Sequence, residues 1–343
     1  MTQTKVTSAE VAALAGVSQS AVSRVFTPGA SASAKTVEKV RKAAAELGYR
    51  PNVLARAMVS GKSRIIGLVV AYLENYFYPE ALEKLSNALQ ARGYHVLVFM
   101  ASQSAGNLED VVDEILDYQV DGIVAASVAL SSNLSERCRA AGVPVVLFNR
   151  TQDDTALSAV ASDNAAGGRA AAEFLVAGGH ERIGYVAGWE GASTQRDREA
   201  GFRAGLCAAG LTLHAREVGN FRQDEAQSAA RAMFSRPDHP DAVFVANDHM
   251  AFAVMDVLRS EMGLSVPGDV SVIGYDDVPI AAWPAYGLTT IRQDAMAMVD
   301  ATVDILLDQI DGISSTPRRA LLPAPLILRQ SARIPKGYPH AGL

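Results

Sequence analysis

The chain has only two cysteines among its 343 residues and no hydrophobic signal segment, and each absence excludes a class of protein. Cys138 and Cys207 lie far apart in predicted helices, which favours two buried thiols over a disulfide. A disulfide-stabilised secreted protein is therefore excluded. We expect a reduced, cytoplasmic protein that has no membrane partner.

Motifs of several enzyme classes are also missing. No Gly-x-Gly-x-x-Gly opens a helix after a strand, and no phosphate loop ending in Gly-Lys-Ser/Thr is present. The chain has no Gly-x-Ser-x-Gly elbow, and none of its six histidines belongs to a His-Glu-x-x-His pair. We therefore expect no enzyme, no cofactor and no metal site.

The sequence does contain a characteristic pattern at residues 6–26, which predicts two short helices joined by a tight turn. Thr7 and Glu10 are three residues apart, the spacing of a capping box at the start of a helix. One face of this first helix would then carry Val11, Leu14 and Ala15. Gly16 permits the sharp turn that follows.

The second helix begins after Ser18, which can cap it, and runs through Phe26. Gln and Arg side chains on its outer face can pair with purine edges in a major groove. We therefore predict a DNA-binding helix-turn-helix with DNA contacts from Thr7, Ser18, Gln19, Ser20, Ser23 and Arg24. The pattern alone also fits a helical pair whose polar face meets only water.

A third helix is predicted over 34–47, capped by Ser33 and ended by Gly48 and Pro51. Its outer face is basic and carries Lys35, Lys39, Arg41 and Lys42. Residues 1–62 hold nine Lys or Arg against three Glu, whereas the rest of the chain holds 22 against 34 Asp or Glu. A basic head on an acidic body favours phosphate contact confined to the head, because counterion release drives the association.

The remaining residues are enough for two lobes. Apolar strand-like runs alternate with amphipathic helices from Ile65 onward and again from about Asp163. This alternation predicts βαβ units and one parallel sheet in each lobe.

Polar pairs follow three of the predicted strands: Asn149-Arg150, Asn247-Asp248 and Asp276-Asp277. Ligands of open parallel sheets bind at the carboxyl ends of the strands, so three such pairs indicate a shared cleft. Asp248 is expected to cap a helix. Arg196 and Arg198 precede a helical packing face, and arginines in such positions are, taken alone, more often surface residues.

The head resembles that of the LacI/GalR family of bacterial transcription regulators. The matching motifs are, in order, Val6-Thr7, Ala15-Gly16-Val17-Ser18, Val22-Ser23-Arg24-Val25, Ser33-Ala34-Lys35-Thr36, Leu47-Gly48-Tyr49 and Pro51-Asn52. The resemblance reaches about residue 330. It implies an all-α helix-turn-helix DNA-binding head and an α/β periplasmic-binding-protein-like body of two lobes with parallel sheets.

The resemblance also implies domain limits. The head would be 1–50, the hinge helix and linker 51–62, the effector-binding and dimerisation domain 63–333, and the tail 334–343. Lobe one would combine 63–162 with 293–322, and lobe two 163–292 with 323–333. In the hinge, Asn52, Ala55 and Met58 would contact the DNA minor groove, with Met58 as the wedge between bases. The alternative for so short a segment is a flexible linker.

In the cleft, the resemblance implies effector contacts from Phe77, Tyr78, Ser127, Asn149, Arg196, Arg198, Phe221, Asn247 and Asp276. Aromatic, amide, carboxylate and arginine side chains together fit a polyhydroxylated sugar, and a purine would use a similar set. Arg150 and Arg196 leave room for a sugar acid or a sugar phosphate.

The expected function is a repressor that binds operator DNA as a homodimer and responds to a small sugar-like effector. The alternatives are a purine-responsive repressor and a cytoplasmic sugar-binding module without operator specificity. The tail has no leucine heptads for a tetramerising coil.

Overall fold

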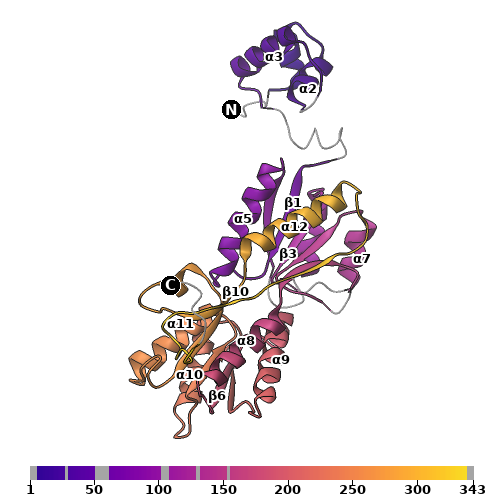
Figure 1. The fold of residues 1–343 in the computed structure, drawn as a ribbon. Helices are drawn as coiled ribbons and strands as arrows, with labels where there is room; N and C mark the ends of the chain where they lie inside the picture. Colours follow the sequence, from indigo (N-terminus) through magenta and orange to yellow (C-terminus); the bar gives the residue numbers. More distant parts are fainter. Residues whose placement is uncertain are drawn as a thin grey trace. The chain divides into compact units, whose positions relative to one another are not determined.

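The computed structural model of the chain describes residues 6–27, 30–50, 62–101, 108–128, 132–152 and 155–337. The chain divides into two compact units, Met1–Arg64 and Ile65–Leu343. Figure 1 shows the helices of the first unit and the mixed helices and strands of the second. The expected hinge contacts of Asn52, Ala55 and Met58 lie outside the described residues.

The first unit contains the helices α1 (Ser8–Ala15), α2 (Gln19–Phe26) and α3 (Ala34–Leu47). The capping box predicted at its start is present, because the backbone N–H of Thr7 donates to Glu10 Oε2 at 2.7 Å and that of Glu10 donates to Thr7 Oγ1 at 3.4 Å. Gly16 is left-handed with φ 63°, as the turn requires.

A small apolar core closes this unit, formed by Val11, Ala12, Ala15, Val22, Val40, Ala43 and Ala44. The prediction that Leu14 shares the buried face of α1 is wrong, because Leu14 is 48% exposed. The helices α2 and α3 cover the Val11, Ala12 and Ala15 side of α1, and Leu14 points away from it.

The second unit is built on two six-stranded sheets, within the residues that the structure describes. The first has the order β11-β5-β4-β3-β1-β2. Its strands are β1 (Ile65–Val70), β2 (His95–Met100), β3 (Gly122–Ala126), β4 (Val145–Phe148), β5 (Ser158–Ser162) and β11 (Arg319–Leu322), all parallel.

Helices cover both faces of this sheet: α5 (Phe77–Ala91) and α12 (Ala295–Ile310) on one, α6 (Leu108–Asp117) and α7 (Ser132–Ala140) on the other. Successive residues of β1 explain this, since Ile66 and Leu68 belong to the core under α5 whereas Ile65 and Val69 belong to the core under α6. A strand that is buried on both faces has a continuous apolar sequence, and β1 has such a sequence.

The second sheet has the order β12-β10-β9-β8-β6-β7, with only β12 antiparallel among the described strands. Its strands are β6 (Ile183–Ala187), β7 (Ala215–Val218), β8 (Ala242–Val245), β9 (Ser271–Asp276), β10 (Thr289–Arg292) and β12 (Leu326–Ile327). The associated helices are α8 (Asn164–Ala177), α9 (Ser193–Ala208), α10 (Gln223–Phe234) and α11 (Asp248–Asp256), which a π-helical turn, Val257–Glu261, continues. A short 3-10 helix, Pro279–Ala282, follows β9.

The chain passes between the two sheets three times, after β5, after β10 and after β11. Because β11 pairs with β5 and β12 pairs with β10, both sheets contain one strand from the last part of the chain. The carboxyl ends of the parallel strands carry the loops that the site uses.

The helices α8 and α9 pack unusually closely. A side chain on Gly168 would collide with the carbonyl of Arg198, and one on Gly201 with the carbonyl of Ala165.

The prediction that Cys207, in α9, is buried is wrong, because Cys207 is exposed. Phe202 and Leu206 form the buried face of α9, and Cys207 lies one residue past that face. Cys138 is buried as predicted.

Candidate functional site

The first candidate surface is the outer face of α2 in the head. Thr7 and the five residues predicted on α2 and its cap are all exposed: Ser18, Gln19, Ser20, Ser23 and Arg24. Within the head, Gln19 Nε2 donates to Ser8 Oγ at 2.8 Å, and Arg24 Nε donates to the carbonyl of Ser20 at 3.4 Å. These bonds hold both long side chains against the helix pair while their remaining donors face solvent.

The outer face of α3 adds positive charge to the same unit. Its four basic residues, Lys35, Lys39, Arg41 and Lys42, are all exposed. The head therefore presents the cations and the hydrogen-bonding side chains that DNA recognition requires.

The second candidate site is a small cavity between the two lobes of the body, about 20 Å³ in volume. Residues from both sheets line it. The lobe of the first sheet supplies Tyr72, Asn75, Tyr78, Ser127, Asn149 and Arg150, and the lobe of the second sheet supplies Thr194, Arg198, Phe221, Asn247 and Asp276. Because six lining residues come from one lobe and five from the other, the shape of the cavity depends on the relative position of the lobes.

Strained backbone brings several of these side chains into the cavity. Ser127, Asn149 and Phe221 have φ of 63°, 70° and 61°, and Asp276 has φ 127°. Non-glycine residues with positive φ are uncommon and cluster at functional sites, because the surrounding structure must hold them there. Each follows or ends a strand, so the turn aims the side chain across the sheet edge.

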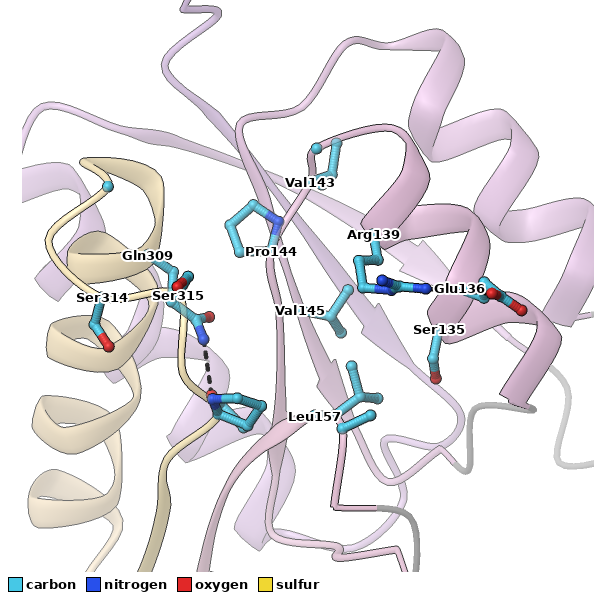
Figure 2. A pocket seen from close by; sticks show the side chains of 15 residues that line it. Ser135, Glu136, Arg139, Val143, Pro144, Val145, Leu157, Gln309, Ser314 and Ser315 are labelled. Carbon is cyan, nitrogen blue, oxygen red and sulfur yellow. Dashed lines mark hydrogen bonds and ion pairs between the residues drawn. The ribbon is translucent and has the colours of Figure 1, made fainter.

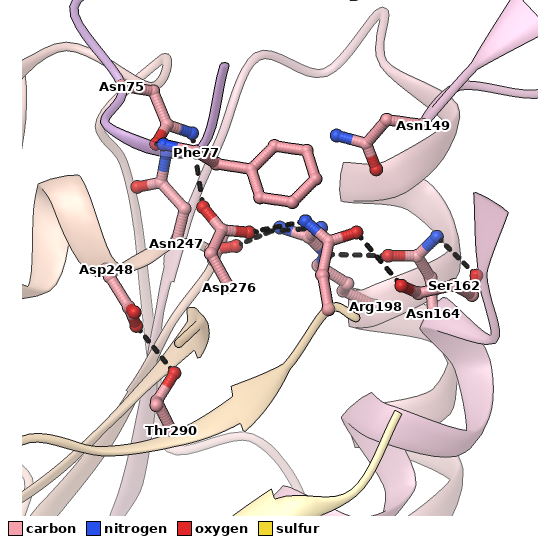
Figure 3. A network of polar contacts seen from close by, with 12 residues as sticks. Asn75, Phe77, Asn149, Ser162, Asn164, Arg198, Asn247, Asp248, Asp276 and Thr290 are labelled. Carbon is pink, nitrogen blue, oxygen red and sulfur yellow. Dashed lines mark hydrogen bonds and ion pairs between the residues drawn. The ribbon is translucent and has the colours of Figure 1, made fainter. Parts of the chain in front are cut away.

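Arg198 lies at the centre of a polar network (Figure 3). Its Nε donates to Asn164 Oδ1 at 2.8 Å, its Nη1 donates to the carbonyl of Ala246, and its guanidinium carbon lies 3.6 Å from the ring centroid of Tyr275. The side chain is only 3% exposed. Protein groups therefore fix the guanidinium before any ligand arrives.

Asp276 joins the two lobes through that network. Its Oδ2 accepts from Asn75 Nδ2 at 3.1 Å, and its Oδ1 accepts from Gln293 Nε2 at 2.7 Å and lies 3.7 Å from Arg198 Nη2. Burial raises the pKa of the Asp276 carboxyl, and the positive charge of Arg198 opposes that rise.

The expected cap role of Asp248 is wrong, because Asn247 caps α11 instead. The backbone N–H of Met250 donates to Asn247 Oδ1 at 2.9 Å. Asp248 is fully buried and accepts from Thr290 Oγ1 at 2.6 Å and from the backbone N–H of Val278 at 3.0 Å. Burial raises its pKa, and the nearby Asp276 adds to the rise.

Several buried polar atoms of the cavity have no hydrogen-bond partner among the described residues. They are Ser127 Oγ, Asn149 Oδ1, Arg150 Nε and Asn247 Nδ2. Buried polar groups in native proteins are almost always paired, and an unpaired one destabilises the fold. Four such atoms around one cavity indicate a site for a ligand with several hydroxyl or charged groups.

The structure brings seven of the nine predicted effector residues to this cavity: Tyr78, Ser127, Asn149, Arg198, Phe221, Asn247 and Asp276. Phe77 instead lies in the adjacent core, where its ring stacks on Phe148 with centroids 6.2 Å apart. Arg196 is exposed and pairs with Asp197 at 2.9 Å, outside the cavity lining.

Sequence reasoning missed Tyr72, Asn75, Thr194 and the supporting Gln293. Two of them could have been predicted from their place in the sequence. Asn75 lies in the loop after β1 and Gln293 directly follows β10, and ligands of parallel sheets bind at the carboxyl ends of the strands.

A wider pocket lies in the first lobe, between α7, the starts of β4 and β5 and the end of α12 (Figure 2). Much of its lining is apolar, with Val143, Pro144, Val145 and Leu157. Gln309 Nε2 donates to Ser158 Oγ there at 2.9 Å. Only one lobe lines this pocket, so a ligand in it would not bridge the lobes.

Neither a metal-binding cluster nor a membrane-spanning helix occurs in the described ranges. No group of three His, Cys, Asp or Glu side chains is arranged to hold a metal ion there. No helix in those ranges has the length and apolar character needed to cross a membrane.

Comparison with known proteins agrees with this architecture. A family described as bacterial regulatory proteins, lacI family, matches residues 7–52, and one described as a periplasmic binding protein-like domain matches residues 172–332. The chain is 34% identical to the HTH-type transcriptional regulator CelR of Thermobifida fusca over 94% of this chain and 96% of that one.

The chain belongs to the lacI family of bacterial regulatory proteins.

Solved structures of lacI-family members agree with the fold. A lac repressor dimer bound to operator and the anti-inducer ONPF matches with a TM-score of 0.87 and 31% identity, over 96% of this chain and 99% of that one. A CelR–cellobiose complex matches with a TM-score of 0.73 and 32% identity, over 96% and 100%. The predicted family, fold class and regulator function are confirmed.

Proposed function

We propose that this lacI-family regulator is a cytoplasmic repressor without enzymatic activity, whose operator affinity is set by a sugar-class effector bound between its two lobes. The observation that carries the proposal is the cavity whose lining comes from both sheets and whose buried polar atoms lack partners. A sugar presents several hydroxyls that can satisfy such atoms, and aromatic rings such as Phe221 can pack against its apolar face. The related CelR structure is a complex with cellobiose, which supports the same ligand class.

The residues divide between two tasks. In the head, Thr7, Ser18, Gln19, Ser20, Ser23 and Arg24 contact the operator, and the basic face of α3 adds phosphate contacts. Residues 51–62 act as the hinge, where Asn52, Ala55 and Met58 meet the minor groove. In the body, 63–333, the effector contacts Tyr78, Ser127, Asn149, Arg198, Phe221, Asn247 and Asp276.

The effector acts by changing how the lobes close. The hydrogen bonds that already cross between them include Asn75 to Asp276, the Tyr72 hydroxyl to the carbonyl of Phe221, and the backbone N–H of Thr151 to Ser193 Oγ at 2.9 Å. A ligand that binds one degree of closure better shifts the population toward it. Thermodynamic linkage then requires operator DNA to change effector affinity by the same factor.

The test uses the full chain in two linked assays. Thermal unfolding is measured with a panel of sugars, sugar acids, sugar phosphates and purines, where a ligand at 100 times its Kd adds about 2.7 kcal/mol. Each ligand that raises the Tm is then added to a titration of operator DNA, selected from a random-sequence pool with the same protein.

A sugar-class ligand that changes operator affinity at least fivefold supports the proposal. A fivefold change corresponds to about 1 kcal/mol of coupling free energy. Stabilisation by purines alone contradicts the sugar part and leaves a purine-responsive repressor. Ligand binding without operator preference at any salt concentration contradicts the repressor function and leaves a sugar-binding module.

A further inference from the structure

Arg150 is a buried cation in the cavity that has no counter-charge. It follows β4 next to Asn149 and is only 6% exposed. Its Nε is buried without a partner, and no hydrogen bond or ion pair of its guanidinium occurs in the part of the chain that the structure describes. Its closest characterised contact is the ring of Trp189 from the other lobe, 5.4 Å from the guanidinium carbon to the centroid.

Arg198, the other arginine of the cavity, is held quite differently. It donates to Asn164 and to the carbonyl of Ala246, stacks on Tyr275 and lies near the carboxylate of Asp276. The charges of Arg198 and Asp276 oppose each other, and Asp276 is also occupied by two amide donors. The positive charge of Arg150 therefore remains as the net charge of the cavity.

Burial and the like charge of Arg198 disfavour a charged Arg150. Both lower its pKa, with burial as the main cause and only Tyr78 opposing it. A guanidinium nevertheless stays charged at neutral pH, so a buried and unpaired one is costly to keep. A partner that supplies a negative charge would remove that cost.

We propose that Arg150 binds an anionic group on the effector, so that the effector is a carboxylated or phosphorylated sugar and not a neutral one. This inference rests on the proposed function of the same cavity. The planar fork of an arginine matches a carboxylate or a phosphate in two parallel hydrogen bonds. The sugar hydroxyls would then pair with the partnerless atoms Ser127 Oγ, Asn149 Oδ1 and Asn247 Nδ2.

The binding experiment compares sugars that differ only in charge. The full chain is titrated by calorimetry with glucose, glucuronate and glucose 6-phosphate, with galactose, galacturonate and galactose 6-phosphate, and with ribose, ribonate and ribose 5-phosphate. In at least one series the acid or the phosphate should bind at least about tenfold more tightly than its neutral parent. Which of the two binds distinguishes a carboxylate from a phosphate ligand.

Variants assign that preference to Arg150. Arg150→Gln should lower the affinity for the anion about tenfold or more and change the affinity for the neutral parent by less than about threefold. Arg150→Lys keeps the charge without the fork and should lose less. Arg231→Gln is the matched control, because this exposed arginine pairs with Glu261 on the surface of the same unit, and it should leave both affinities unchanged.

A second measurement requires no knowledge of the ligand. Arg150→Met keeps the apolar stem and removes the charge. If the unpaired charge of Arg150 destabilises the ligand-free protein, the Tm of the dialysed full chain should rise. If the cation mainly ties the lobes together through Trp189, the same change should lower the Tm. A lowered Tm overturns the inference, whatever the panel returns.

The outcomes also separate this inference from the proposed function. Binding of neutral sugars alone, with an effect on operator affinity, overturns the anionic ligand and leaves the sugar-responsive repressor intact. An acid or phosphate that binds through Arg150 but leaves operator affinity unchanged supports the ligand class and contradicts the repressor mechanism.

Discussion

At the scale of single residues, Asp276 combines two tasks that usually belong to separate side chains. Its Oδ2 accepts a hydrogen bond from the side-chain amide of Asn75 in the opposite lobe, while its Oδ1 faces Arg198 and Gln293. A ligand hydroxyl that approaches Asp276 must therefore share or displace these donors. We therefore propose that ligand binding and lobe closure compete directly at Asp276.

Asp276→Asn should remove the effector response while operator binding remains. The amide keeps the shape of the side chain, but it loses the charge and one acceptor that hydroxyl donors require, at a cost of about 1.5–3 kcal/mol in ligand binding. Calorimetry measures the effector affinity, and a titration with operator DNA measures the operator affinity with and without effector. A variant that no longer unfolds cooperatively would show a structural role instead.

Arg24→Ala should weaken operator binding by about 1–3 kcal/mol and relax base preference at one position. The reason is that Arg24 lies exposed on α2, the helix whose outer face carries the side chains able to read bases. Binding to selected and to random DNA is compared in parallel. Lys39→Ala on α3 is the control and should weaken both equally, and an equal loss for Arg24→Ala would reduce it to a phosphate contact.

At the scale of elements, the crossing of α8 and α9 determines where Arg198 lies. Gly168 and Gly201 let the two backbones approach so closely that no side chain fits at either position. Asn164 at the start of α8 then reaches Arg198 on α9 at 2.8 Å. The guanidinium is positioned by helix packing, well before any ligand contact.

Gly201→Ala should lower the stability of the body by about 1–3 kcal/mol, because the added methyl collides with the carbonyl of Ala165. The same displacement of α9 should weaken effector binding, although Gly201 touches no part of the cavity. Ala204→Ser adds one atom at an exposed position of the same helix and serves as the control. Unchanged Tm and affinity would mean that the helices can separate freely.

Ion pairs of Asp277 also connect the segments of the chain that cross between the sheets. Asp277, 6% exposed, accepts from Arg292 Nε at the end of β10 at 2.7 Å and from Arg329 Nη2 just after β12 at 2.6 Å. Arg292 ends β10 and Arg329 follows β12, and the segments next to both strands cross between the sheets. Asp277 thus links two crossings directly beside Asp276.

Asp277→Asn should loosen this connection without changing the cavity lining. Since Arg292 is half exposed, solvent weakens the ion pairs, and we expect a loss of about 1–2 kcal/mol in unfolding free energy. The more specific expectation is a reduced effect of the effector on operator affinity. The coupling, measured as the ratio of operator Kd values with and without ligand, would remain unchanged if Asp277 is only structural.

At the scale of the whole molecule, charge is divided unevenly along the chain. The first 62 residues have an excess of six positive charges, and the rest has an excess of twelve negative ones. DNA binding through the head alone releases counterions in proportion to the phosphates it neutralises. An acidic body discourages contacts elsewhere.

Operator affinity should therefore fall linearly with salt on a double-logarithmic scale. The slope should be about −0.9 for each phosphate contact. Lys39→Gln should make the slope shallower by about one unit if that side chain touches a phosphate. A slope that stays the same in the variant would place Lys39 outside the interface.

Much of this molecule could be predicted from its sequence, for physical reasons that differ between the parts. Caps and turns are local, so Thr7, Ser18 and Gly16 predict the two short helices and the turn between them. Continuous apolar runs reveal buried parallel strands, as in β1. The resemblance then placed Arg198 and Asp276 in one cleft, where the structure has both.

The remainder depends on geometry that sequence patterns do not encode. Whether Arg196 or Arg198 faces the cavity depends on the rotation of α9 against α8. Asn247, and not Asp248, caps α11, because a shift of one residue decides where the helix begins. Leu14 and Cys207 are exposed because their neighbours already fill the buried face of each helix.

The bonds that close the cleft also have a consequence for the time course of recognition. While the Tyr72 hydroxyl holds the carbonyl of Phe221 and Asn75 holds Asp276, the buried side chains of the cavity have little contact with solvent. Loading must then wait for a spontaneous parting of the lobes. In a rapid-mixing experiment the observed rate would level off at high ligand concentration, and its ceiling would be the opening rate of the protein, the same for every sugar that enters.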